Sequence, residues 1–89
     1  LNKMNELQFI TLKEVIELVT LKKTAIYEKI KKGEFPPQIR MGGNTVVFIK
    51  SEMEFYLASK IFDKDEKETV QKILEKREET FKPILEMYM

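Results

Sequence analysis

The segment from Leu21 to Phe35, LKKTAIYEKIKKGEF, constrains the fold more than any other part of the chain. It predicts a short helix over residues 22–32, because Ile26 and Ile30 stand one turn apart and form an apolar stripe in a polar sequence. Gly33 follows as the C-terminal cap, since glycine adopts a positive φ at little cost. The remaining surface of this helix is strongly cationic, with Lys22, Lys23, Lys29, Lys31 and Lys32.

Another helix is predicted just before this one. Thr11 and Glu14 form a T-x-x-E capping box, and apolar residues at helical spacing indicate a helix over roughly Leu12 to Leu18. The few residues left between the two helices allow only a sharp turn, which is the spacing of a helix-turn-helix. Two hydroxyls, those of Thr20 and Thr24, are alternative caps for the start of the cationic helix.

A β-hairpin is predicted over residues 38–49. Two prolines after Phe35 prevent the helix from continuing, and two β-prone runs, Gln38 to Met41 and Thr45 to Ile49, flank the loop Gly42-Gly43-Asn44. Strict alternation would direct one set of side chains inward and the other toward solvent. The inward set is Ile39, Met41, Val46 and Phe48, and the outward set is Arg40, Thr45 and Val47.

A third helix is predicted to begin at a second capping box, formed by Ser51 and Glu54. Its apolar stripe consists of Met53, Tyr56, Leu57 and Ile61. The expected core of the domain is Ile26, Ile30, Phe35, Phe48 and Leu57.

A fourth helix is predicted from Glu66 to Lys82, with Asp65 as its cap and Pro83 kinking or ending it. Two interpretations of this helix stay open. Its narrow apolar face could fold back on the preceding domain, or it could pair with a second copy of the chain in a homodimer. Its stripe consists of Val70, Ile73, Leu74, Arg77 and Phe81, followed by an apolar tail over residues 84–89.

The composition excludes several classes of function. The chain of 89 residues contains no cysteine and no histidine, so it lacks disulfides, thiolate nucleophiles, imidazole bases and the usual zinc ligands. No glycine-rich phosphate loop or other catalytic set is present, and we therefore expect neither an enzyme nor a cofactor. We also expect a soluble, cytoplasmic protein without a membrane partner, and a frayed lead-in over residues 1–8.

Charge is distributed unevenly along the chain. Residues 1–50 carry nine Lys and Arg against five Asp and Glu, a balance of +4, whereas residues 51–89 carry seven against ten, a balance of −3, which together give the net +1. This asymmetry is typical of a domain that presents one basic face to a polyanion.

The order of these motifs resembles the AlpA-type prophage regulators and excisionases, a branch of the MerR-like winged-helix superfamily. The similarity covers Phe9 to Ala58, and the chain departs from the family pattern at Lys22, where a serine is usual, and at Asn44, where an arginine is frequent. The matching motifs are T-x-x-E at residues 11–14, V-T-L at 19–21, T-x-I-Y at 24–27, I-K-K-G-E-F-P at 30–36, G-G-N-x-V-x-F at 42–48 and S-E-M-E-x-Y-L at 51–57.

The resulting fold prediction is mainly α with a small β-hairpin: a winged helix-turn-helix domain over residues 9–61 and a helical extension over residues 63–89. The predicted function is sequence-specific binding of double-stranded DNA, and the resemblance implies transcriptional regulation or excision with an integrase in a mobile element. The alternative is a protein interaction module that docks a recombinase or polymerase subunit through the basic helix. The candidate DNA-binding residues are Lys22, Lys23, Thr24, Tyr27, Glu28, Lys31, Arg40 and Asn44.

Overall fold

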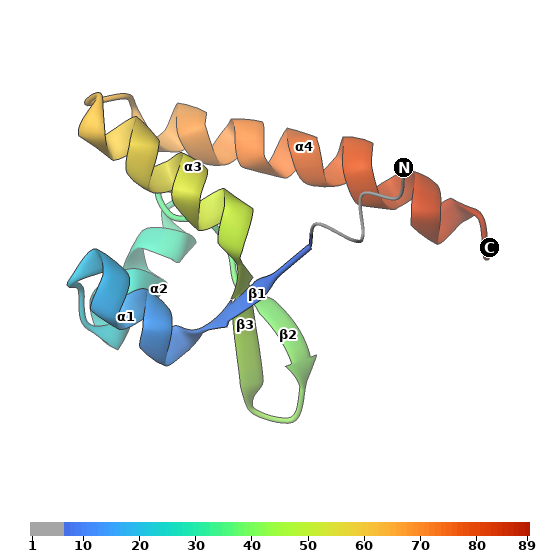
Figure 1. Ribbon diagram of the computed structural model, residues 1–89, viewed down its shortest axis with the longest axis horizontal. Helices are drawn as coiled ribbons and strands as arrows, with labels where there is room; N and C mark the ends of the chain where they lie inside the picture. Colours follow the sequence, from blue (N-terminus) through green and yellow to red (C-terminus); the bar gives the residue numbers. More distant parts are fainter. Residues whose placement is uncertain (1–6) are drawn as a thin grey trace.

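The computed structural model describes residues 7–89, so most of the predicted lead-in lies outside the described residues. In Figure 1 the longest helix runs along one edge of the molecule and the hairpin tip projects at the opposite edge. The elements are β1 (Phe9–Thr11), α1 (Leu12–Val19), α2 (Lys23–Lys31), β2 (Ile39–Gly42), β3 (Thr45–Ile49), α3 (Lys50–Ile61) and α4 (Glu66–Glu86).

The predicted capping box opens α1. The Thr11 hydroxyl oxygen accepts from the Glu14 N–H at 3.1 Å, and Glu14 Oε1 accepts from the Thr11 N–H at 2.9 Å. The bond from the Thr11 N–H, and then one that the Thr11 hydroxyl donates to the same carboxylate oxygen at 3.0 Å, lower the pKa of Glu14 below its usual 4.5. Helix α1 ends at Thr20, which adopts a left-handed conformation with φ of 57°.

The predicted glycine cap ends α2. Gly33 has φ of 74°, its N–H donates to the Ile30 carbonyl at 3.0 Å, and the Glu34 N–H reaches back to the Lys29 carbonyl at 2.8 Å. This pair of bonds is the Schellman arrangement, which satisfies carbonyls at the end of a helix. The chain therefore leaves α2 abruptly and enters the Pro36-Pro37 segment, which has no regular secondary structure.

The sheet has three antiparallel strands in the order β1-β3-β2, which is one strand more than the sequence predicted. Phe9 pairs with Ile49 and Thr11 with Val47, so β1 covers the free edge of β3. Val47 was expected on the solvent side but is half-buried, because β3 is the central strand and Val47 also faces Ile39 of β2. The hairpin itself is confirmed.

The predicted inward orientation of Met41 is wrong, because β2 contains a bulge at this residue. Arg40 pairs with Val46 and Gly42 with Thr45, so Met41 is an extra residue without its own partner. One extra residue breaks the alternation of a strand. Met41 consequently faces outward, with 54% of its surface exposed, instead of contributing to the core.

The predicted capping box at Ser51 is wrong. Helix α3 begins at Lys50, directly after β3, and its N-cap is Ile49, which makes no side-chain cap. The Lys50 N–H instead donates to the Gln8 carbonyl at 2.9 Å, continuing the ladder between β1 and β3 into the first residue of the helix. Ile61, expected in the apolar stripe, is 78% exposed at the end of α3.

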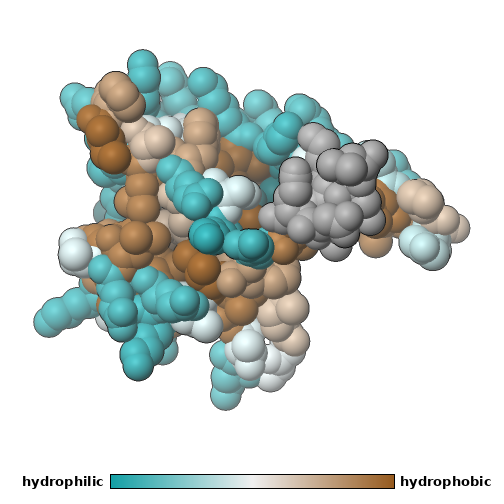
Figure 2. Space-filling view, in the orientation of Figure 1, coloured by the Kyte–Doolittle hydropathy of each residue, from teal (hydrophilic) through white to brown (hydrophobic). Residues whose placement is uncertain are grey.

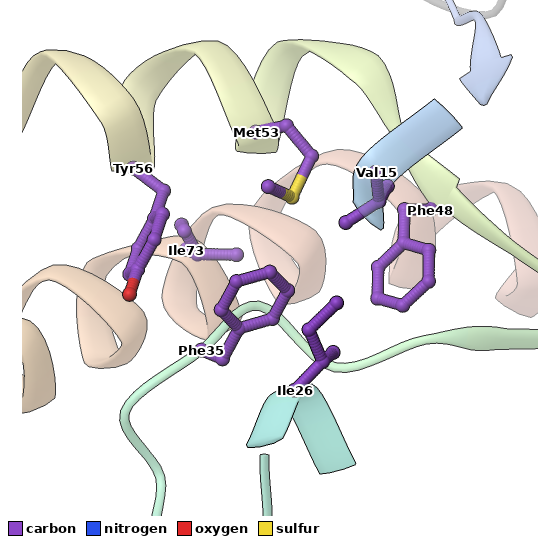
Figure 3. Close-up of a cluster of buried hydrophobic side chains, with 7 residues drawn as sticks. All are labelled: Val15, Ile26, Phe35, Phe48, Met53, Tyr56 and Ile73. Carbon is purple, nitrogen blue, oxygen red and sulfur yellow. The ribbon is translucent and has the colours of Figure 1, made fainter. Parts of the chain in front are cut away.

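The core lies where α1, α2, α3, α4 and the sheet meet (Figure 3). Phe35 contacts two aromatic rings edge-on, with centroids 6.1 Å from Phe48 and 4.9 Å from Tyr56. Ile26, Phe35 and Phe48 are fully buried as predicted, and Ile30 and Leu57 pack against them while partly buried. The complete buried cluster is Val15, Ile26, Phe35, Phe48, Met53, Tyr56 and Ile73.

Helix α4 folds back on α3, which is the first of the two interpretations offered by the sequence. Val70 and Ile73 are buried, and Ile73 belongs to the core cluster. The Asp65 side chain caps the helix, accepting from the Glu68 N–H at 2.9 Å, as predicted. Pro83 does not end the helix, which continues to Glu86. Beyond the proline the hydrogen bonding resumes, and the Met87 N–H reaches the Pro83 carbonyl at 3.2 Å.

The left-handed Thr20 generates a prediction about the turn between α1 and α2. We expect Thr20→Gly to raise the free energy of unfolding by up to about 1 kcal/mol, because glycine has no Cβ to strain at this φ. The matched control, Thr24→Gly inside α2, should lower it by about 0.3–0.5 kcal/mol, since glycine disfavours a helix more than threonine does. Urea denaturation measures both, and equal destabilisation by the two variants would contradict the assignment of strain to Thr20.

Candidate nucleic-acid interface

The candidate interface is centred on the exposed side of α2. Ile26 is buried in the core, and this fixes which side of the helix faces outward. Lys22, Lys23, Lys31 and Lys32 are exposed and make no ion pair among the described residues. These four residues are called the outer lysines below.

The start of α2 has a positive character of its own. Lys22 is its N-cap, and its side chain accepts no backbone hydrogen bond, so neither Thr20 nor Thr24 supplies the expected hydroxyl cap. The Thr20 hydroxyl instead donates to the Val19 carbonyl at 2.6 Å. The first N–H groups of a helix without a side-chain cap remain available to an external acceptor, and the helix dipole favours an anion there.

The structure divides the candidate DNA-binding residues between two elements. The candidate residues on α2 and its cap are exposed, except Tyr27, which is half-buried. Arg40 and Asn44 are exposed on the hairpin, and no hydrogen bond or ion pair in the described part of the chain connects them to α2. The two groups of candidate residues would form one binding site only for a ligand that contacts both α2 and the hairpin. The α2 group is Lys22, Lys23, Thr24, Tyr27, Glu28 and Lys31.

Lys29 differs from the outer lysines, because it turns toward α4. Its Nζ lies 2.8 Å from Glu66 Oε2, and its side chain is only 25% exposed. The same carboxylate oxygen accepts from the Tyr56 hydroxyl at 2.7 Å and from Lys60 Nζ at 3.0 Å. This arrangement, the Glu66 cluster, joins α2, α3 and α4 at one carboxylate.

The Glu66 cluster perturbs the ionisation of its members. Partial burial raises the pKa of Glu66, but hydrogen bonds from Lys29, Tyr56 and Lys60 lower it by a larger amount in total. The pKa therefore falls from 4.5 to about 2. Burial, and then the hydrogen bond to Glu66, raise the pKa of the Tyr56 hydroxyl well above its usual 10. Glu66 is therefore ionised and Tyr56 neutral at any pH near 7.

A second polar contact holds α4 further along. Arg77 Nε and Nη2 donate to the two carboxylate oxygens of Glu52, each at 2.7 Å, and Nη2 also donates to the Pro37 carbonyl at 2.6 Å. This explains the arginine that interrupts the apolar stripe of α4. Arg77 connects α3 to the Pro36-Pro37 segment after α2, and a planar guanidinium suits the bidentate contact with Glu52.

Sequence reasoning missed both polar clusters. Glu66 lies 37 positions after Lys29 and Arg77 lies 25 positions after Glu52, and no local periodicity relates residues so far apart. The only local signal was the position of Arg77 on an otherwise apolar face, which indicates a paired charge.

Neither a metal site nor a membrane-spanning helix is found within residues 7–89. No group of three or more acidic, histidine or cysteine side chains is placed to hold a metal ion. No helix in this range combines the length and apolar content that crossing a bilayer requires.

The two short helices around a sharp turn, followed by a β-hairpin and a supporting helix, define a winged helix-like protein. The chain belongs to the AlpA family, since the family model described as prophage CP4-57 regulatory protein (AlpA) matches residues 8–61. The uncharacterized protein ORF88 of Enterobacteria phage P4 is 43% identical over 54 residues, which are 61% of this chain and 61% of that protein. The chain thus spans about three-fifths of the curated relative that it matches. No solved structure matches it significantly.

The family match ends with α3, so α4 lies outside it. The two polar clusters nevertheless join α4 to residues inside the matched region, namely Lys29, Tyr56 and Lys60 at one end and Glu52 and Pro37 at the other. Helix α4 is therefore fastened directly to the helix that carries the outer lysines.

The lowered pKa of Glu66 predicts a pH-dependent contribution to stability. A folded pKa of about 2, below the ordinary 4.5, means that the contribution is fully present above about pH 5 and is lost as the pH falls toward 2. We expect Glu66→Gln to cost about 1–3 kcal/mol of unfolding free energy at pH 7, and this cost should shrink on acidification.

Urea denaturation of the native protein and the variant across this pH range measures the effect. Glu75→Gln, which changes an exposed glutamate of the same helix, is the matched control and should stay within about 0.5 kcal/mol of the native protein at pH 7. A cost of Glu66→Gln that does not vary with pH would contradict the ionic role of Glu66.

Proposed function

We propose that the chain binds double-stranded DNA in a sequence-specific manner and regulates genes of a prophage or related mobile element. The observation that carries the proposal is the difference between Lys29, which is neutralised by Glu66, and the outer lysines of the same helix, which are exposed without ion pairs among the described residues. Positive charge left uncovered on one face of a helix suits a polyanion. Membership in a family of prophage regulatory proteins supports this function.

In the proposed complex α2 enters the major groove, with its first residues toward the base edges. Lys23, Thr24 and Tyr27 contact bases, and Glu28 accepts a hydrogen bond from a cytosine amino group. Half-burial of Tyr27 leaves only part of its ring for this contact. Burial of Ile26 on the opposite side of α2 anchors these residues to the core, so they approach the groove on a rigid element.

Contacts to the DNA backbone complete the complex. Lys22 and Lys31, near the two ends of α2, and Arg40 on the hairpin bind phosphates and release condensed counterions. Asn44 lies at the hairpin tip beside two glycines with positive φ, Gly42 and Gly43, so the tip is narrow enough to approach a second part of the duplex. The first N–H groups of α2 add a site for one phosphate.

The biological role that we propose is control of transcription, excision of the mobile element, or both. An integrase is the protein partner in excision, where binding beside an attachment site would organise the DNA for recombination. Combined binding of the two proteins on attachment-site DNA, compared with binding of each alone, tests this partner.

Selection from random duplexes of about 30 base pairs, roughly three helical turns, tests the proposed function. We expect one enriched sequence, bound with an affinity that falls steeply as salt is added. Fluorescence anisotropy on that duplex should show a loss of at least about tenfold for Lys23→Glu combined with Lys31→Glu, and a salt slope smaller by roughly one for Lys31→Ala alone.

Lys67→Glu combined with Lys82→Glu is the matched control, because it makes the same two charge reversals at exposed positions of α4. It should bind the selected duplex almost as tightly as the native protein. The proposal fails if no sequence is enriched, or if the α2 and α4 reversals weaken binding equally, which would indicate only a nonspecific effect of net charge.

A further inference from the structure

The outward side of α3 carries aromatic side chains that the core does not use. Met53 and Tyr56 face the core and are buried, but Phe55 is 42% exposed and Phe62, directly after the helix, is 75% exposed. Phe55 and Phe62 stand seven positions apart, which places them on the same side of the helix, two turns from each other. Helix α3 therefore has a second apolar face, and this face is open to solvent. Figure 2 shows apolar colour on the molecular surface in several places.

A groove follows this face along the boundary between α3 and α4, which lie side by side (Figure 1). Its larger hollow has a volume of about 480 Å³, and Phe55 and Phe81 are among the apolar side chains on its walls. A smaller hollow of about 370 Å³ reaches Phe62. Phe55 and Lys72 line both hollows, so the two adjoin, and together they are called the α3–α4 groove below.

The α3–α4 groove is elongated along the helices. On α4 its lining residues run from Glu68 to Phe81, which corresponds to about 20 Å of helix. This length suits about three to four turns of another helix better than a compact small molecule. The walls are formed mainly by two helices, whose backbone groups are already hydrogen-bonded. An extended segment would find few backbone partners there, whereas a helix satisfies its own backbone groups.

The larger hollow has a positive border. Lys72 and Lys76 line it and make no ion pair among residues 7–89. Arg77 and Glu52 also line it, but their charges cancel, because Arg77 Nε donates to Glu52 Oε2 at 2.7 Å. Two positive charges are thus left without a partner beside an apolar wall, and this arrangement favours an occupant that carries carboxylates.

The smaller hollow has charges of both signs. Lys64 lies there with two carboxylates, those of Asp65 and Glu68. The Asp65 carboxylate also caps α4 by accepting from the Glu68 N–H at 2.9 Å. Acidic groups of an occupant are therefore favoured at the larger hollow only, and apolar groups along the whole groove.

We propose that the α3–α4 groove binds an amphipathic helix of a partner protein, with its apolar side chains on Phe55 and Phe62 and its carboxylates on Lys72 and Lys76. A helix that lays its apolar face into a groove is a recurring mode of peptide recognition. Aromatic side chains are enriched among the residues that anchor an interface. The inference does not depend on the proposed DNA binding, because it rests on α3 and α4.

The groove and the candidate DNA-binding surface lie on different elements. The outer lysines stand on α2 and at its two caps, and α2 contributes no residue to either hollow. Helix α4 and the hairpin tip lie at opposite edges of the molecule (Figure 1). A partner helix in the groove therefore leaves the outer face of α2 uncovered, and loss of one binding activity should leave the other intact.

Selection from random peptides of about 18 residues, roughly five turns of helix, with the immobilised full chain as target, tests the proposal. We expect enriched peptides with apolar residues at helical spacing and with Asp or Glu beside that stripe. A labelled enriched peptide should bind the full chain in fluorescence anisotropy with a dissociation constant of roughly 1–100 µM, because an interface of this size is weak.

Substitution of the two aromatic residues tests their role as anchors. Phe55→Ala combined with Phe62→Ala should weaken binding of the labelled peptide at least about tenfold. Leu18→Ala combined with Ile61→Ala is the matched control, because these residues are 51% and 78% exposed and line neither hollow. The control should bind the peptide like the native chain. Circular dichroism checks that both variants stay folded.

A charge exchange tests the positive border separately. Lys72→Glu combined with Lys76→Glu should weaken binding of the peptide about tenfold, and changing the acidic residues of the peptide to lysine should restore most of the affinity for this variant. Lys67→Glu combined with Lys82→Glu is the matched control, since both residues are exposed on α4 and line neither hollow. Absence of this restoration would overturn the assignment of the carboxylates to Lys72 and Lys76.

The docking of a partner helix is overturned if no peptide is enriched, if the enriched peptides lack acidic residues, or if the two alanine pairs weaken binding equally. Self-association of the full chain that is abolished by Phe55→Ala with Phe62→Ala would instead assign the groove to a second copy. Tighter peptide binding after Met4→Asp would assign it to the amino-terminal residues of the same chain. Binding of every variant to the selected duplex is measured in parallel, so that failure of docking and failure of DNA binding are distinguished.

Discussion

The packing of Phe35 between Phe48 and Tyr56 is the interaction on which the rest of the structure depends. Phe35 lies just after the end of α2, Phe48 belongs to β3 and Tyr56 belongs to α3, so a single buried ring brings the three parts of the winged unit together. The Schellman turn at Gly33 and the prolines after Phe35 direct the chain into this position. The orientation of α2 relative to the sheet follows from that contact.

Tyr56 extends the apolar core into the Glu66 cluster. Its ring contacts Phe35, and its hydroxyl donates to Glu66, which also pairs with Lys29. Among the described residues, Glu66 of the acidic C-terminal half thus pairs with one lysine of α2, Lys29, and the other lysines of α2 form no ion pair. Because Lys29 is the inner lysine, the acidic part of the chain stabilises α2 without covering its outer face. The opposite charge balances of the two halves therefore have a structural use.

Local signals in the sequence were sufficient for most of the elements. The Thr11 and Glu14 box, the cap at Gly33 and the Asp65 cap were predicted correctly, because each is satisfied by atoms within a few residues. The box at Ser51 was predicted by the same logic and was wrong, because pairing between β1 and β3 carries the chain directly into α3. Strand β1 and the bulge at Met41 depend on partners elsewhere in the chain, which no local pattern shows.

The candidate site was predictable only in part for the same reason. Exposure of the outer lysines follows from the apolar spacing of α2, but the separate role of Lys29 depends on a carboxylate from a different helix. The choice between a folded-back and a fully paired α4 also needed tertiary structure. Val70 and Ile73 of the predicted stripe are buried within the chain, whereas Leu85 of the apolar tail is exposed, so the stripe and the tail lie in different environments.

The direct junction of β3 and α3 has a mechanical consequence. Ile49 ends the strand and Lys50 begins the helix, so no flexible residue separates the hairpin from α3. We expect the hairpin and α3 to keep a fixed relative orientation, because no loop residue lies between them to absorb a change in φ and ψ. Phe55 lies on α3 at the wall of the α3–α4 groove. A ligand that displaced the hairpin tip would therefore be expected to shift this wall as well.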